Sequence, residues 1–174
     1  LYPSPVADLM DGADGMLQIP HGCFEQASST NYPNVLALSY LDAIGASAPA
    51  VRAKGRSVLD EGYDLLTSYE CSELGFEWFG DDPGHEVLSA YGLLQFTDMA
   101  EVFPVDPKMV ARTSAWLLGR RDGRGGFELD PKSLDSFGRA PAEITNAYCT
   151  YALAVSGVPA VDLAIELDRL AARA

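Results

Sequence analysis

The chain has 174 residues, 48% of them apolar and 21% charged, which suits a single globular domain with a hydrophobic core. Its 25 acidic and 12 basic side chains give a formal net charge of −13 at neutral pH. Because this excess of negative charge repels phosphate groups, we expect no nucleic-acid partner and no direct contact of this domain with a membrane. The longest apolar run spans residues 151–155, far short of the roughly 20 residues of a membrane-spanning helix.

Apolar residues recur at helical spacing along most of the chain and predict six helices after a lead-in of residues 1–22. The first should end before Gly45, a residue that suits the left-handed position after a helix. The fourth should begin at Asp106-Pro107, an N-cap residue followed by a first-turn proline. The six helices are expected to start after Gln26, at Pro49, after 82–84, at Pro107, before Ile144 and at Pro159.

The last two predicted helices have regular apolar patterns. In the fifth, one stripe at spacings of three and four residues marks the apolar face, formed by Ile144, Ala147, Tyr148, Tyr151, Ala152 and Val155. In the sixth, Leu163, Leu167 and Leu170 are expected to point inward.

Two short sequences occur twice along the chain. The sequence Gly-Phe-Glu occurs at residues 75–77 and again at 126–128. The sequence of residues 86–91 is repeated in similar form at 143–148. Each copy is expected to be a loop followed by a helical hairpin, and hairpins that repeat at about 50 residues stack into rings or solenoids. The sequence therefore predicts an all-α fold, an α/α toroid of helical hairpins, with three hairpins over residues 27–174 and no closure of the ring within them.

The cysteines form an odd set of three, Cys23, Cys71 and Cys149, with no Cys-x-x-Cys pair that would indicate a zinc ribbon. At most one disulfide, between Cys71 and Cys149, could form, although both residues also suit free, inert thiols in apolar helical segments. The acidic residues beside His85 would point around a turn without converging, so we expect no metal and no other cofactor.

The turn into the first helix carries a cysteine and a glutamine three positions apart, Cys23 and Gln26. At this spacing the thiol sulfur can attack the glutamine amide carbonyl, release ammonia and leave a cyclic thioester. Gly22 permits a tight turn before the cysteine, and the free N–H groups at the helix start favour the thiolate and stabilise the oxyanion. The alternative is that Cys23 is a small core residue near a helix start.

Residues 20–26, Pro-His-Gly-Cys-Phe-Glu-Gln, followed by Tyr-Pro-Asn-Val at 32–35, resemble the thioester domain of the alpha-2-macroglobulin and complement family. The family motif typically has the form Pro-Tyr-Gly-Cys-Gly-Glu-Gln. Segments 84–91, 116–117 and 125–127 are similar to later parts of that domain, and the bacterial members are the most similar. The resemblance implies a torus of six helical hairpins, of which residues 1–174 would form about the first half as one partial domain.

The resemblance also implies roles for the motif residues. Cys23 would supply the thioester sulfur, Gln26 the acyl group, and Glu25 a structural carboxylate. Phe24, which stands where the family has a second glycine, and the first hairpin are candidates to shield the thioester from water. His21 replaces the usual tyrosine and is either a base for thioester chemistry or a histidine tolerated at a turn.

Members that prefer hydroxyl targets use a histidine in the loop after the Gly-x-Phe turn, and the corresponding position here is Asp135. An aspartate cannot form an acyl-imidazole, and no histidine follows His85. Direct attack by an amine is therefore the expected route, with lysines as targets and hydroxyls slower.

The family resemblance implies a single-turnover trap that is not an enzyme in the usual sense. Proteolysis of a bait segment elsewhere would expose the thioester, which then acylates lysines of the captured protease. The implied partners are target proteases and other domains of the same protein, and the implied location is the bacterial periplasm or cell envelope, with a role in defence. The alternatives are a toroid enzyme for terpenoids or polysaccharides, although no DDxxD metal cluster is present, and a hydrolase based on Cys23.

Two polar clusters have simpler interpretations beside functional ones. Residues 77–85, rich in acidic and aromatic side chains, form either a binding surface or a capped polar segment before a helix. Arg120, Arg121 and Arg124 form either a ligand site or a complement to the negative end of a helix dipole.

Overall fold

The computed structural model describes residue 12 and residues 15–129 and 140–173. Its helices are α2 (Phe24–Ala43), α3 (Pro49–Thr67), α4 (Glu86–Met99), α5 (Pro107–Gly119), α6 (Ala142–Val155), the 3-10 helix η1 (Ala160–Leu163) and α7 (Ala164–Ala171). The described residues contain no β-strand beyond two isolated bridges. The predicted all-α fold is confirmed, and none of the described helices is long and apolar enough to span a membrane.

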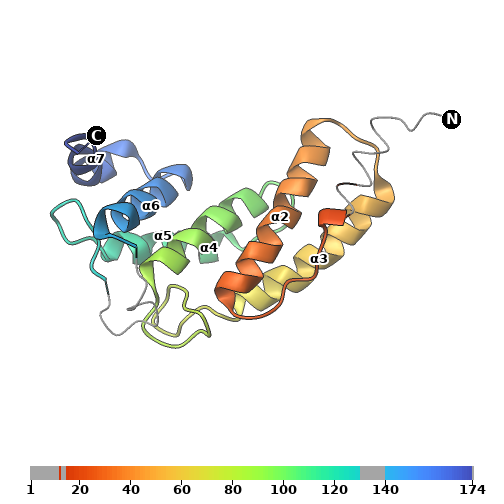
Figure 1. Cartoon of the computed structure of the whole chain (residues 1–174), viewed down its shortest axis with the longest axis horizontal. Helices are drawn as coiled ribbons and strands as arrows, with labels where there is room; N and C mark the ends of the chain where they lie inside the picture. The colour runs from red at the N-terminus through yellow and green to blue at the C-terminus, as the bar shows by residue number, and fades with distance from the viewer. Residues whose placement is uncertain (1–11, 13–14, 130–139, 174) are drawn as a thin grey trace.

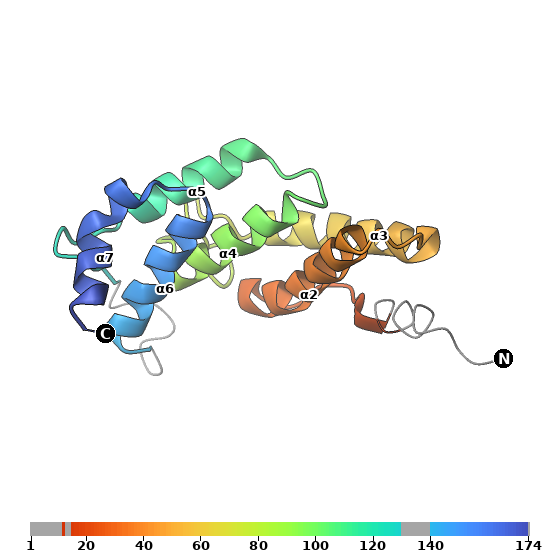
Figure 2. The same ribbon diagram turned by 90° about the horizontal axis from the view of Figure 1, so that it is seen from above.

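The helices form three successive hairpins. Helices α2, α4 and α6 lie side by side in one row, and α3, α5 and α7 each pack against the row helix that precedes them in the chain (Figures 1 and 2). The predicted starts at Pro49 and Pro107 are confirmed, and the Asp106 carboxylate caps α5 by accepting the Lys108 N–H at 2.9 Å. The stacking of hairpins agrees with the toroid prediction, whereas closure of a ring stays a prediction.

The two larger apolar clusters lie on either side of α4, and a small third one is formed by Leu17, Ala37 and Val58. The first lies among α2, α3 and α4, where Phe24 stacks on Phe76 with ring centroids 4.9 Å apart and Phe76 contacts Phe96 at 5.5 Å. The second lies among α4, α5 and α6 and includes Phe127 and Cys149. Helix α4 is therefore the central element, buried on both flanks.

The two Gly-Phe-Glu copies occupy equivalent places before consecutive row helices. The Phe76 N–H donates to Ser89 Oγ at 2.8 Å, and the Phe127 N–H donates to Asn146 Oδ1 at 3.1 Å. Ser89 and Asn146 are both the fourth residue of the repeated helix start, at 86–91 and 143–148. The sequence repeat is thus a structural repeat in which a side chain of the helix fixes the loop before it.

The predicted fifth helix is confirmed as α6, but much of its apolar stripe is exposed. Ile144 and Tyr151 are each 59% exposed, and Val155 is 43% exposed. The buried side of α6 carries mostly small or polar residues, namely Thr145, Asn146, Cys149, Thr150, Ala152 and Leu153. Close packing against α4 favours small side chains, whereas Ile144, Tyr151 and Val155 of the apolar stripe lie on a face that the described residues leave exposed.

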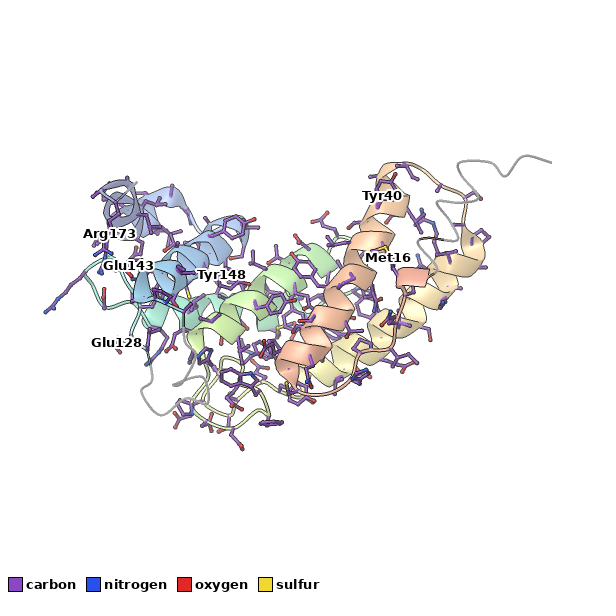
Figure 3. The ribbon with its side chains drawn as sticks, viewed as in Figure 1. Met16, Tyr40, Glu128, Glu143, Tyr148 and Arg173 are labelled. Atoms are coloured by element: carbon purple, nitrogen blue, oxygen red, sulfur yellow. The ribbon has the colours of Figure 1, made fainter. Side chains whose placement is uncertain are left out.

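The last helix also differs from its prediction. The chain after Pro159 forms η1 before α7, and Leu163 is buried as expected. Leu167, however, is 38% exposed, and the buried residue of α7 is Glu166, whose Oε2 lies 3.7 Å from Nη1 of Arg121. Beyond α7, Arg173 pairs with Glu143 at the start of α6 (Figure 3).

Candidate functional site: the Cys23–Gln26 turn

The predicted motif forms the first turn of α2. Cys23 is the N-cap residue, with an extended backbone, and Gly22 before it has a φ of +85°, in the left-handed region that favours glycine. The helix then begins at Phe24, and the Cys23 carbonyl accepts the Ala27 N–H at 2.8 Å. The cysteine therefore lies at the positive end of the α2 dipole, as the sequence predicts.

Cys23 and Gln26 contact each other in both directions as a capping box. The Gln26 side chain folds back so that its Oε1 accepts the Cys23 backbone N–H at 3.3 Å, while the Cys23 side chain faces the Gln26 backbone N–H. A hydrogen-bond donor thus already lies at the oxygen that becomes negatively charged when the Gln26 carbonyl is attacked.

Gly22 is required by this arrangement for a second reason. A Cβ atom at Gly22 would lie 2.2 Å from Gln26 Oε1 and 3.1 Å from Gln26 Cδ. The glutamine carbonyl therefore occupies the space that any other side chain at position 22 would need.

The segment between α3 and α4 holds the motif from outside. Tyr69 Oη donates to the Gly22 carbonyl at 2.6 Å, and the Trp78 carbonyl accepts the Phe24 N–H at 2.9 Å. Trp78 Nε1 also donates to Glu25 Oε2 at 2.9 Å, and a structural role for Glu25 stays a prediction. The sequence alone did not identify Tyr69 or Trp78 as part of this site. For Trp78 the available sequence signal was the aromatic content of residues 77–85.

A cavity of about 470 Å³ lies over the motif and is lined by His21, Cys23, Glu25, Gln26, Ser29 and Thr30. Phe24 does not line it, because its ring is fully buried against Phe76. The prediction that Phe24 shields the thioester is therefore wrong within the described residues. His21 lines the cavity and is exposed, so a role as a base stays a prediction, and Asp135 lies outside the described residues.

The other two cysteines are buried free thiols in different places, so the possible Cys71–Cys149 disulfide is not formed. Cys71 Sγ lies 3.2 Å from the Asp81 carbonyl, and Cys149 Sγ lies 3.8 Å from the Glu86 carbonyl. Burial raises the pKa of each thiol to about 12.

We therefore expect Cys71 and Cys149 to resist alkylation in the folded protein. With a pKa of about 12, only about one thiol in 10⁴ is ionised at pH 8, and the thiolate is the reactive form. Mass mapping after iodoacetamide treatment should show label on a free Cys23 thiol long before the other two in native buffer, and on all three in denaturant. Equal labelling in native buffer would contradict the burial of Cys71 and Cys149.

The polar segment before α4 has structural roles. His85 Nδ1 accepts the Leu88 N–H at 3.3 Å, the Asp82 carboxylate accepts the Glu73 N–H at 2.9 Å, and Glu86 pairs with Arg120. These groups turn to separate partners, and among the described residues no three metal-binding side chains converge. The interpretation as a capped segment before a helix is confirmed, with Trp78 as an additional contact to the motif.

Two of the three arginines after α5 have different roles. Arg121 Nε donates to the Leu118 carbonyl at 2.9 Å, which is the expected contact with the end of α5. Arg120 instead pairs with the buried Glu86 across 2.8 Å, so its main role is neutralisation of a buried charge.

An all-helical domain of stacked hairpins, with a glycine turn that places a cysteine against a glutamine carbonyl, has the features of a thioester domain. A sequence model of the A-macroglobulin TED domain matches residues 4–158. The chain belongs to this family of thioester domains in A-macroglobulin and complement proteins.

Two relatives illustrate the similarity. The chain is 28% identical over 129 residues to thioester-containing protein 1 allele R1 of Anopheles gambiae, a match that covers 74% of this chain and 10% of that protein. It is 26% identical over 129 residues to alpha-2-macroglobulin-like protein 1 of Mus musculus, covering 73% of this chain and 9% of that protein. The chain thus spans about a tenth of the length of these relatives.

Proposed function

We propose that Cys23 and Gln26 form an internal thioester, and that the protein uses it once to acylate an amine of a captured protease. In the forming step, Cys23 Sγ bonds to Gln26 Cδ, the Cδ–N bond breaks, and the amide nitrogen leaves as ammonia with the thiol proton. In the using step, an amine nitrogen bonds to Cδ, the Cδ–S bond breaks, and Cys23 regains a thiol proton from the amine.

The single observation that carries the proposal is the position of the Gln26 side chain. An exposed glutamine in a first helical turn is free to extend into solvent, yet here its carbonyl oxygen lies 3.3 Å from the Cys23 nitrogen. This conformation places the electrophilic carbon beside the residue that carries the nucleophile and places a donor at its oxygen. The name of the mosquito relative, a thioester-containing protein, supports the same assignment.

The wider role rests on the family. Target proteases, attacked through lysine amines, and other domains of the same protein are the proposed partners. Because the cavity over the motif is open in the described residues, we propose that another domain covers the thioester until it is needed. The bacterial source, the periplasmic location and the role in defence stay predictions.

The test is the intact mass of the protein before and after methylamine. We expect the untreated protein to be lighter than its sequence by one ammonia, and methylamine to add to Gln26 and release the Cys23 thiol. Gln26→Ala should abolish both changes, as should Cys23→Ala.

Thr30→Ala is a matched control for the mass deficit, and Gln26→Ala separates this function from a Cys23 hydrolase. Thr30→Ala alters a residue of the same cavity without touching the acyl group, so the mass deficit should persist. A protein of full sequence mass, with a freely alkylated Cys23 in the wild type, would overturn the proposal. A Gln26→Ala variant that still turns over an ester or amide would instead support the hydrolase.

A further inference from the structure

The peptide unit that joins Gly22 to Cys23 is hydrogen-bonded at both ends. Its carbonyl oxygen accepts Tyr69 Oη at 2.6 Å, and its N–H donates to Gln26 Oε1 at 3.3 Å. The Tyr69 hydroxyl and the Gln26 carbonyl are therefore connected through one rigid peptide plane. Tyr69 lies 47 positions from Gly22 in the sequence, just after α3 ends at Thr67.

The Tyr69 ring is held in place through its contact with Phe24. The Tyr69 ring packs edge-on against Phe24, with centroids 6.3 Å apart and planes at 88°. Phe24 is fully buried and donates its backbone N–H to the Trp78 carbonyl. The tyrosine is therefore held against the first residue of the helix that the motif begins.

A hydrogen bond to a peptide carbonyl has two effects on the N–H of the same peptide. It fixes the rotation of the peptide plane, which sets the direction of the N–H, and it polarises the amide so that the N–H becomes a stronger donor. Gly22 has a φ of +85°, and glycine gives the chain no steric reason to keep this orientation by itself. The short contact with Tyr69 supplies the missing restraint.

We propose that Tyr69 is a positioning residue for the thioester, acting through the Gly22–Cys23 peptide on the oxygen of the Gln26 acyl group. The inference rests on the proposed function. When an amine attacks Gln26 Cδ, the negative charge that develops on Oε1 is stabilised by the Cys23 N–H, whose direction and strength depend on the Tyr69 hydroxyl. The charge disappears when the Cδ–S bond breaks and the amine proton passes to the sulfur.

The test compares Tyr69→Phe with Tyr63→Phe in the intact protein. Tyr69→Phe removes the hydroxyl and keeps the ring on Phe24. Tyr63 is the matched control, because its hydroxyl also binds the backbone. It accepts the Asp106 N–H at 3.0 Å, and this contact lies away from the motif. Both variants should lose a similar stability in urea.

The expected result is a selective loss of reactivity in Tyr69→Phe. Its intact thioester should react with methylamine about fivefold more slowly than the wild type, a smaller effect than the 10²–10³ typical of losing an oxyanion donor itself. The infrared stretching band of the thioester carbonyl should move to higher frequency, because the oxygen receives a weaker hydrogen bond. Tyr63→Phe should change neither the rate nor the band.

Two outcomes would overturn the inference, and both are distinct from failure of the proposed function. One is a Tyr69→Phe protein with the wild-type rate and carbonyl band. The other is equal slowing in Tyr63→Phe, which would assign the effect to stability. If the wild type carried no thioester in the mass measurement, the proposed function itself would fail and with it the inference.

Discussion

Replacement of Gly22 by alanine is expected to slow thioester formation by at least about 10² while leaving the domain folded. The new Cβ would lie 2.2 Å from Gln26 Oε1, so the flexible Gln26 side chain must move away. That movement relieves the clash cheaply, but it also removes the acyl carbon from Cys23. Because displacements of about 1 Å reduce rates by about 10², we expect thioester formation to slow by at least that factor.

Gly45→Ala is the matched control for the backbone effect. Gly45 has a φ of +61°, and a Cβ there would meet no atom within 4 Å. Both variants should lose about 1–2 kcal/mol of unfolding free energy from a left-handed non-glycine residue. Urea unfolding measures this loss, and intact mass measures the thioester. A Gly22→Ala protein that still lacks one ammonia would show that the glutamine does not need the observed position.

The helices and the motif turn could be predicted because their signals are local. Pro49 and Pro107 fix φ at a helix start, and Asp106 caps the next turn within two residues. The Cys23–Gln26 contact spans a single helical turn, so spacing alone brings the two residues together. The same holds for the repeat, whose loop and helix start lie close together in each copy.

The buried faces of α6 and α7 could not be predicted from apolar spacing. Periodicity identifies a stripe but not the element that covers it, and within the described residues Ile144, Tyr151 and Val155 of the stripe are exposed. The face of α6 toward α4 instead carries Cys149 and hydrogen-bonded polar residues such as Thr150 and Asn146. Glu166 is buried beside Arg121, a partner that lies far away in sequence.

The contacts that hold the motif were unpredictable for the same reason. Tyr69 and Trp78 reach Gly22 and Glu25 across 47 and 53 residues of sequence. Nothing local distinguishes Tyr69 from the other tyrosines of the chain. Only the packing of the α3–α4 segment against α2 shows that one hydroxyl binds the peptide before the cysteine.

Replacement of Arg120 by alanine is expected to destabilise the domain strongly. Glu86 is fully buried at the start of α4, and Arg120 lies 2.8 Å from one of its carboxylate oxygens. The other oxygen has no hydrogen-bond partner among the described residues. Removal of one partner from a buried pair costs about 3–5 kcal/mol because the remaining charge is uncompensated.

The repeat supplies the control, because Glu143 is the equivalent of Glu86 in the second copy. Its pair with Arg173 is about half exposed on both sides, so Arg173→Ala should cost about 0–1 kcal/mol. Urea unfolding of both variants measures the difference. If Arg120→Ala cost no more than Arg173→Ala, burial of Glu86 would not determine the effect.

The charge itself can be separated from the lost packing of Arg120. Adding Glu86→Gln to Arg120→Ala removes the uncompensated charge, so the double variant should be more stable than Arg120→Ala alone.

The loss of Arg120 should also affect the thioester motif, because α4 begins beside the loop that holds the motif. The His85 N–H donates to the carbonyl of Phe76 at 2.8 Å, and Phe76 lies two residues before Trp78. Slower methylamine reaction in Arg120→Ala, restored in the double variant, would connect the buried pair to the site through this loop, whereas an unchanged rate would confine its role to stability.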